Sequence, residues 1–236
     1  MKKIIFLSYF LLLFFLFPTK SQASLVTVEG SGEVVVKVLS LQDGLALSPE
    51  KKEFNLVDVL GEGFGEDAIS LKKTDEKVAL FLGGKNREFD VTNYSEDLIE
   101  IEERGEVKSL RIGLSGGRFS IEQDGFLVLT DFPIKVDPRE GDVAVETSTG
   151  NVFLSVLPLE AAKAALRARS ISSVKEAAFV EKDGQLVYEM KGDKDIDIFK
   201  VVDYSVPVSV DVSVSTGEVV FVDQPVWLRV LTFLIG

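Results

Sequence analysis

The chain has 236 residues, with 38 acidic against 26 basic side chains, no histidine and no cysteine. The missing residue types exclude disulfides, thiolate nucleophiles, cysteine-type metal sites, Ser-His-Asp triads and histidine-ligated zinc or haem. A formal net charge of −12 argues against a nucleic-acid partner, because phosphate groups attract basic surfaces.

Residues 1–23 have the pattern of an export signal. Lys2 and Lys3 precede a run over residues 4–17 that is almost entirely apolar. As a helix this run spans about 21 Å, short of a hydrocarbon core of about 30 Å. Small residues at the −3 and −1 positions fit cleavage after Ala23, which makes Ser24 the first mature residue. We therefore expect an exported protein that is extracellular, at the cell surface or periplasmic; an uncleaved N-terminal anchor is the alternative.

Residues 24–157 predict a β-rich domain of antiparallel hairpins. Apolar and polar side chains alternate over short runs such as 110–114 and 126–130, and glycine-containing turn signals such as Asp124-Gly125 separate the runs. Glycine supplies the positive φ that tight hairpin turns require. The spacing of these turns is typical of an antiparallel sandwich or meander.

A helix is predicted from about Leu159 to Arg169. Pro158 suits a first helical turn, where its missing N–H has no intrahelical partner, and apolar residues then recur at helical spacing. We place the boundary between two domains, 24–157 and 158–224, at the start of this helix.

The segment that follows the helix is strand-rich, and three of its features resemble a PepSY domain. They are the alanine-rich helix containing Glu160-Ala161-Ala162, the strand Gly-Gln-Leu-Val-Tyr-Glu-Met at 184–190, and the closing Val-Ser-Val-Ser-Thr-Gly-Glu-Val at 212–219. The resemblance covers about residues 158–223. It implies one helix packed on a small antiparallel sheet, with an extra strand pair inserted around residues 191–207.

PepSY domains are associated with propeptides and peptidase regulators of the bacterial envelope. The resemblance therefore implies a non-catalytic protein that binds or regulates a protein partner, a peptidase among the candidates, and it transfers no catalytic, cofactor-binding or metal-binding residue. Two alternatives stay open: a structural cell-surface protein, and an envelope hydrolase that uses paired carboxylates.

Three Ser-x-x-Lys sequences, which begin at Ser48, Ser70 and Ser172, match the nucleophile motif of serine acylases. The pattern is short, and the companion Ser-Asp-Asn and Lys-Thr-Gly motifs are missing from the chain. We therefore assign no catalytic residue, no cofactor and no metal ligand, and expect a protein that is not an enzyme.

Residues 225–236 form an apolar tail that is too short to cross a bilayer as a helix. Trp227, Val230, Leu231 and Leu234 follow helical spacing and share one face. We predict that these four residues contact a membrane interface or a protein partner; packing of the tail on its own domain is the alternative.

Overall fold

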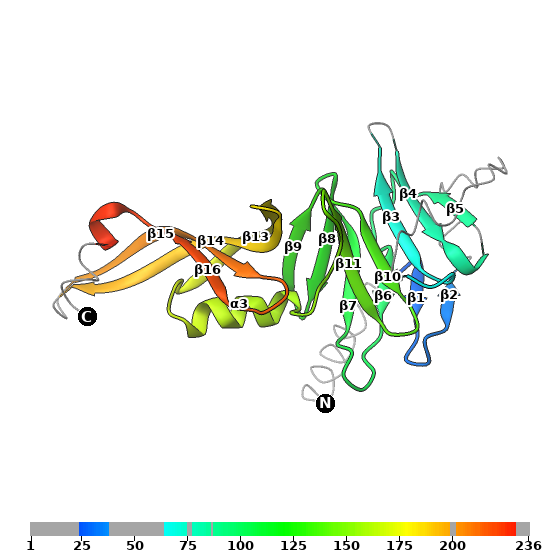
Figure 1. Cartoon of the computed structure of the whole chain (residues 1–236), viewed down its shortest axis with the longest axis horizontal. Coiled ribbons are helices and arrows are strands. Elements are labelled where there is room, and N and C mark those ends of the chain that lie inside the picture. The colour runs from blue at the N-terminus through cyan, green and yellow to red at the C-terminus, as the bar shows by residue number, and fades with distance from the viewer. Residues whose placement is uncertain (1–23, 38–63, 75–76, 86, 199–201, 230–236) are drawn as a thin grey trace, which may run out of the picture.

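The computed structural model describes residues 24–37, 64–74, 77–85, 87–198 and 202–229 (Figure 1). Across this part of the chain the protein is mainly β, as the sequence predicts, and its strands form two sheets. The signal segment, Ala23 included, lies outside the described residues.

The smaller sheet has six strands in the order β12-β11-β10-β3-β4-β5, and all neighbours are antiparallel. A short 3-10 helix, η2 (Gly83–Lys85), follows β4. The strands are β3 (Ile69–Lys73), β4 (Val78–Leu82), β5 (Arg87–Asp90), β10 (Ile134–Asp137), β11 (Asp142–Thr147) and β12 (Gly150–Phe153).

The larger sheet has ten strands in the order β16-β15-β14-β13-β9-β8-β7-β6-β1-β2. Its neighbours are antiparallel except for the parallel pairs β1·β6 and β9·β13. The strands are β1 (Val26–Val28), β2 (Val34–Val36), β6 (Ile99–Ile101), β7 (Leu110–Ser115), β8 (Arg118–Gln123), β9 (Phe126–Thr130), β13 (Ser173–Lys182), β14 (Gln185–Ile198), β15 (Val202–Ser213) and β16 (Val219–Asp223).

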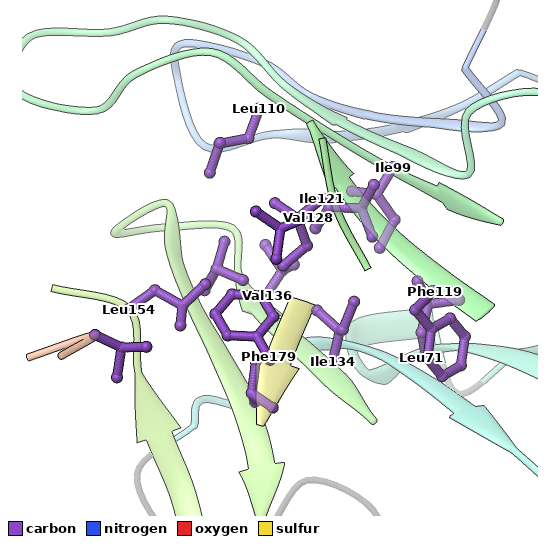
Figure 2. Packing of buried hydrophobic residues seen from close by; sticks show 14 of the residues in the cluster. Leu71, Ile99, Leu110, Phe119, Ile121, Val128, Ile134, Val136, Leu154 and Phe179 are labelled. Carbon is purple, nitrogen blue, oxygen red and sulfur yellow. The ribbon is translucent and has the colours of Figure 1, made fainter. Parts of the chain in front are cut away.

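The two sheets share a hydrophobic core (Figure 2). Ile99, Ile121 and Val128 of the larger sheet meet Leu71 and Val136 of the smaller one, and all five side chains are fully buried. Side chains alternate between the two faces of a strand, so each of these strands contributes every second residue to the core. This half of the molecule is a β-sandwich, one of the two architectures predicted.

The helix α3 (Pro158–Arg167) begins with the proline at its first position, as predicted. It ends before the predicted Arg169, because that residue has a left-handed φ of 55°. Ala161, Ala162 and Ala165 form its buried stripe, and the helix packs against β8, β9, β14 and β15. The small alanine side chains allow the helix to lie close to the sheet.

The extra strand pair predicted around residues 191–207 is wrong. These residues continue β14 and β15, which pair from Val187↔Ser213 to Ile198↔Val202 without a break. Strand β13 pairs with β14 only as far as Asp193. Beyond that residue β14 and β15 form a two-stranded ribbon that projects from the sheet (Figure 1).

One sheet runs across the predicted domain boundary at residues 157 and 158. Strand β13 pairs with β9 at Ala178↔Leu129, and α3 contacts strands from both sides of the boundary. The core cluster likewise includes residues of the sandwich and of α3, β13, β14 and β15.

Candidate functional site

Exposed large apolar side chains gather in the C-terminal unit, defined here as residues 158–229. Within the described part of the chain eight such side chains are at the surface, and five of them lie between Tyr204 and Trp227. They are Tyr204 (52% exposed), Val220 (50%), Phe221 (54%), Val226 (74%) and Trp227 (43%). Tyr204 and Trp227 contact each other, whereas Phe221 pairs with Asp211, about 23 Å further along β15. The exposed side chains therefore form separate patches, of which the one around Tyr204 and Trp227 is the candidate contact surface.

The first turn of the tail folds against the ribbon. The N–H of Leu228 donates a hydrogen bond to the Pro225 carbonyl oxygen at 3.0 Å, and Leu228 is fully buried. Tyr204 of β15 and Trp227 have ring centroids 6.0 Å apart at an interplanar angle of 59°. Burial of Leu228 holds Val226 and Trp227 at the surface.

The structure describes one of the four tail residues that are predicted to contact a membrane or a partner. Trp227 is described, and it is exposed beside the ribbon. Val230, Leu231 and Leu234 lie outside the described residues, so their contacts stay a prediction.

An open pocket of about 710 Å³ lies where the ribbon leaves the sheet. Its lining combines the apolar Pro207 and Val226 with charged side chains, among them Lys175, Lys191 and Asp193. Lys175 and Asp193 form an ion pair at 2.6 Å. The charged lining residues are Lys175, Glu176, Lys191, Asp193 and Asp223, so the pocket combines charged and apolar groups.

A charge cluster lies on the sheet face opposite α3. Lys182 Nζ donates to Glu189 Oε1 at 2.9 Å and to both carboxylate oxygens of Asp211 at 2.9 Å. The Lys182 hydrogen bond lowers the pKa of Glu189. Burial opposes the charge of Lys182, but its bonds to Asp211 and Glu189 outweigh burial and raise its pKa. The exposed Phe221 stands opposite Asp211 in register, so fixed charges flank an aromatic side chain.

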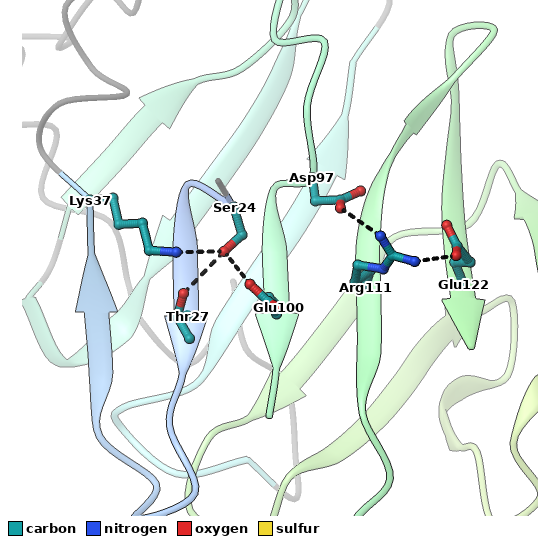
Figure 3. A network of polar contacts seen from close by, with 7 residues as sticks. All are labelled: Ser24, Thr27, Lys37, Asp97, Glu100, Arg111 and Glu122. Atoms are coloured by element: carbon teal, nitrogen blue, oxygen red, sulfur yellow. Dashed lines mark hydrogen bonds and ion pairs between the residues drawn. The ribbon is translucent and has the colours of Figure 1, made fainter. Parts of the chain in front are cut away.

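A second polar network lies on the face of the larger sheet that points away from the sandwich core (Figure 3). Glu100, Arg111 and Glu122 face one another across β6, β7 and β8. Arg111 contacts Glu122 at 2.5 Å and Asp97 at 3.7 Å, yet burial raises the pKa of Asp97. Ser24, the predicted first mature residue, is buried and its Oγ donates to Glu100 Oε2 at 2.8 Å.

The Ser-x-x-Lys sequences do not assemble a nucleophile and a base where the structure describes them. Ser70 is buried, whereas Lys73 is three residues further along β3, on the opposite face, and bonds the Gly117 carbonyl oxygen. Ser172 Oγ accepts a hydrogen bond from a backbone N–H of β14, and its Lys175 is held by the ion pair described above. Ser48 lies outside the described residues.

Sequence analysis did not identify Lys135, which with Asp211 is one of the two most deeply buried charged residues among those described. The Ile134-Lys135-Val136 alternation predicts a lysine in solvent, but only 2% of Lys135 is exposed. Its partners come from β11 and β12, and no local pattern indicates them.

In comparisons with known proteins, no family model, no curated protein and no solved structure matches this chain. Among the helices of the described residues, none is long and apolar enough to cross a membrane.

Proposed function

We propose that the protein is an exported, non-catalytic protein of the bacterial cell envelope that binds a protein partner through its C-terminal unit. The observation that carries the proposal is the exposed aromatic pair of Tyr204 and Trp227, together with the exposed Val226 that precedes Trp227. Aromatic residues are enriched at the centre of protein interfaces, and charged residues such as Lys, Glu and Asp are found at the rim.

The PepSY-like character of the unit is part of the proposal. It is supported by the position of α3 on one face of the antiparallel strands β13 to β16, next to the buried Tyr188. The charge cluster of Lys182, Glu189 and Asp211 lies on the other face. By this resemblance, we propose that the partner is an envelope protein whose activity is restrained on binding, a peptidase being the first class to test.

Site-specific photocrosslinking in the producing cells tests the proposal. A photoreactive amino acid replaces Tyr204 or Trp227 in the full chain, and Phe153 (38% exposed) or Leu166 (40% exposed) in matched controls. We expect one discrete crosslinked species in the envelope fraction from the first two positions and none from the controls. Equal labelling at all four positions, or none at any, contradicts partner binding through this surface.

The structural alternative draws on the open edge of the larger sheet. Strand β16 is the last strand of that sheet, and its Val220 and Phe221 are exposed. An uncovered apolar edge can pair with another chain. Sedimentation of the purified protein over a range of concentrations separates the two functions, since ordered self-association that Phe221→Lys abolishes favours the structural one.

The hydrolase alternative needs one carboxylic acid that is protonated near neutral pH. Glu189 and Asp211 share the same lysine amine, and the pKa of Glu189 is lowered rather than raised. This acidic pair therefore favours binding over hydrolysis.

A further inference from the structure

Lys135 lies in the middle of β10, on the face of the six-stranded sheet that points away from the shared core. Its neighbours Ile134 and Val136 are core residues, so alternation along the strand sends the Lys135 side chain to the opposite face. Only 2% of that side chain is exposed. An amine buried to this degree requires polar partners.

Those partners are an amide and a carboxylate on the two next strands. Lys135 Nζ lies 2.9 Å from Asn151 Oδ1 of β12 and 3.0 Å from Glu146 Oε2 of β11. Glu146 and Asn151 stand directly opposite each other in the antiparallel register. The sheet therefore holds an amine, a side-chain amide and an acid together without the help of a flexible loop.

The amide carbon is close to the amine. A carbonyl bond is about 1.2 Å long, so Asn151 Cγ lies no more than about 4.1 Å from Lys135 Nζ. Reacting atoms in a near-attack geometry are about 3–3.5 Å apart. A small rotation of either side chain covers the difference.

We propose that Lys135 and Asn151 form an intramolecular isopeptide bond, with Glu146 as the group that carries the protons. This cross-link would join β10 to β12 across β11. It would give a chain without cysteine a covalent bond between strands of its six-stranded sheet.

The atoms balance in an acyl transfer with loss of ammonia. The Lys135 ammonium gives one proton to Glu146, and the free electron pair on Nζ attacks Asn151 Cγ. Glu146 passes its proton to Asn151 Nδ2, the Cγ–Nδ2 bond breaks as the carbonyl re-forms, and ammonia leaves. Glu146 accepts the second Nζ proton and releases it to the ammonia, so that the products are an amide and ammonium, and the carboxylate is regenerated.

The charged groups around Glu146 determine the starting state of the reaction. Burial would raise the pKa of Glu146, but Lys135 and Lys72 outweigh it and lower this pKa, so the pair begins as an ion pair. Lys72 lies 3.4 Å from Glu146 and remains its counter-ion after Lys135 has become an amide.

Intact-mass spectrometry of the full folded chain tests the proposal directly. We expect a mass about 17 Da below that of the sequence, the mass of one ammonia. Trypsin should not cleave after Lys135, and peptide 119–139 should be recovered joined to peptide 140–163. Lys73→Met, at a lysine on the opposite face of β3 that bonds the Gly117 carbonyl oxygen, leaves the three reacting groups and Lys72 in place and should keep the cross-link.

Glu146→Gln and Lys135→Arg should each restore the full mass, with folding checked by circular dichroism. A full-mass wild-type protein that trypsin cleaves after Lys135 overturns the proposal. So does a loss of about 17 Da with unjoined peptides, which indicates a cyclised asparagine instead. A folded Glu146→Gln protein that still carries the cross-link removes Glu146 from the reaction.

Discussion

The Tyr188 hydroxyl donates a hydrogen bond to the backbone carbonyl oxygen of Val156, 2.5 Å away. Tyr188 is fully buried on β14, and Val156 lies in the segment between β12 and α3. Burial strongly raises the pKa of the Tyr188 hydroxyl, so it stays a donor throughout the physiological range. The bond therefore ties the C-terminal sheet to the chain that enters α3.

Tyr188→Phe should destabilise the protein by about 1–3 kcal/mol, because the buried carbonyl oxygen of Val156 loses its partner. Urea unfolding measures the change. Tyr204→Phe, at a tyrosine that is 52% exposed, is the control and should cost little. Equal losses of unfolding free energy in the two variants would show that the hydrogen bond from Tyr188 to Val156 does not stabilise the protein.

Gly192→Ala should be more damaging than its small size suggests. A Cβ atom on Gly192 would lie 1.8 Å from the Ser173 carbonyl oxygen, so β13 and β14 would have to separate. We expect a loss of about 1–3 kcal/mol or more in urea unfolding. Gly113→Ala is the matched control, since its Cβ would meet atoms only at 3.5 Å and beyond.

Glu189 and Asp97 predict opposite dependences of stability on pH. The Lys182 hydrogen bond lowers the pKa of Glu189 below 4.5 in the folded protein. The ionised Glu189 therefore contributes fully to the free energy of unfolding above pH 4.5, and this contribution is lost as the pH falls through the folded-state pKa. Burial raises the pKa of Asp97 above 3.8. The protonated Asp97 therefore contributes fully to the free energy of unfolding below pH 3.8, and this contribution is lost as the pH rises through the folded-state pKa.

Urea midpoints of Glu189→Gln and Asp97→Asn, compared with wild type between neutral pH and about pH 4, check both signs. As the pH falls, the urea midpoint of Glu189→Gln should approach that of wild type. The urea midpoint of Asp97→Asn should fall further below that of wild type. Differences from wild type that do not change with pH would mean that neither carboxyl group titrates differently on unfolding.

The proposed isopeptide bond predicts a large effect on stability. It closes a loop between residues 16 positions apart, and a loop of this length contributes about 3 kcal/mol in the chain-entropy description. Asn151→Ala should therefore lower the free energy of unfolding by at least about that amount. Lys72→Met should have a much smaller effect, and similar losses in the two variants would argue that only the ion pairs are at work.

The continuous sheet and core predict that the molecule unfolds in one transition. Trp227 is the only tryptophan and reports on the C-terminal unit, whereas far-ultraviolet circular dichroism reports on all strands. Coincident urea transitions from the two signals are expected. An earlier transition of Trp227 would instead support the two separable domains predicted from the sequence, as would release of stable fragments by limited proteolysis near Leu157.

Local features of the fold could be predicted from the sequence because neighbouring residues determine them. Asp124-Gly125 and Asp183-Gly184 both have the positive φ values of tight hairpin turns. Pro158 marks the start of α3. In each case the turn or helix depends on the backbone preference of a residue or two, which a sequence displays directly.

Long-range features could not be predicted in the same way. The Ala178↔Leu129 pairing joins strands about fifty residues apart, and the sequence pattern of neither strand indicates which strand it pairs with. The continuous β14 could not be predicted because Gly192, in its middle, adds no side chain to the alternation, and the close approach of β13 at this residue is not visible in the sequence. Lys135 was missed because burial on the outer face depends on groups from other strands.

The ribbon of β14 and β15 extends away from the sandwich, so the molecule has a sandwich at one end and a ribbon at the other. At about 3.3 Å per residue, the five residues of β14 beyond Asp193 extend the ribbon about 17 Å past the last support from β13, and Tyr204, which pairs with Ile196, lies about 10 Å past it. A protein held in place by its sandwich could therefore touch a second surface with the ribbon alone. The distance it can bridge is then determined by the length of one hairpin, so shortening β14 and β15 in matched pairs would change that distance and leave the sandwich intact.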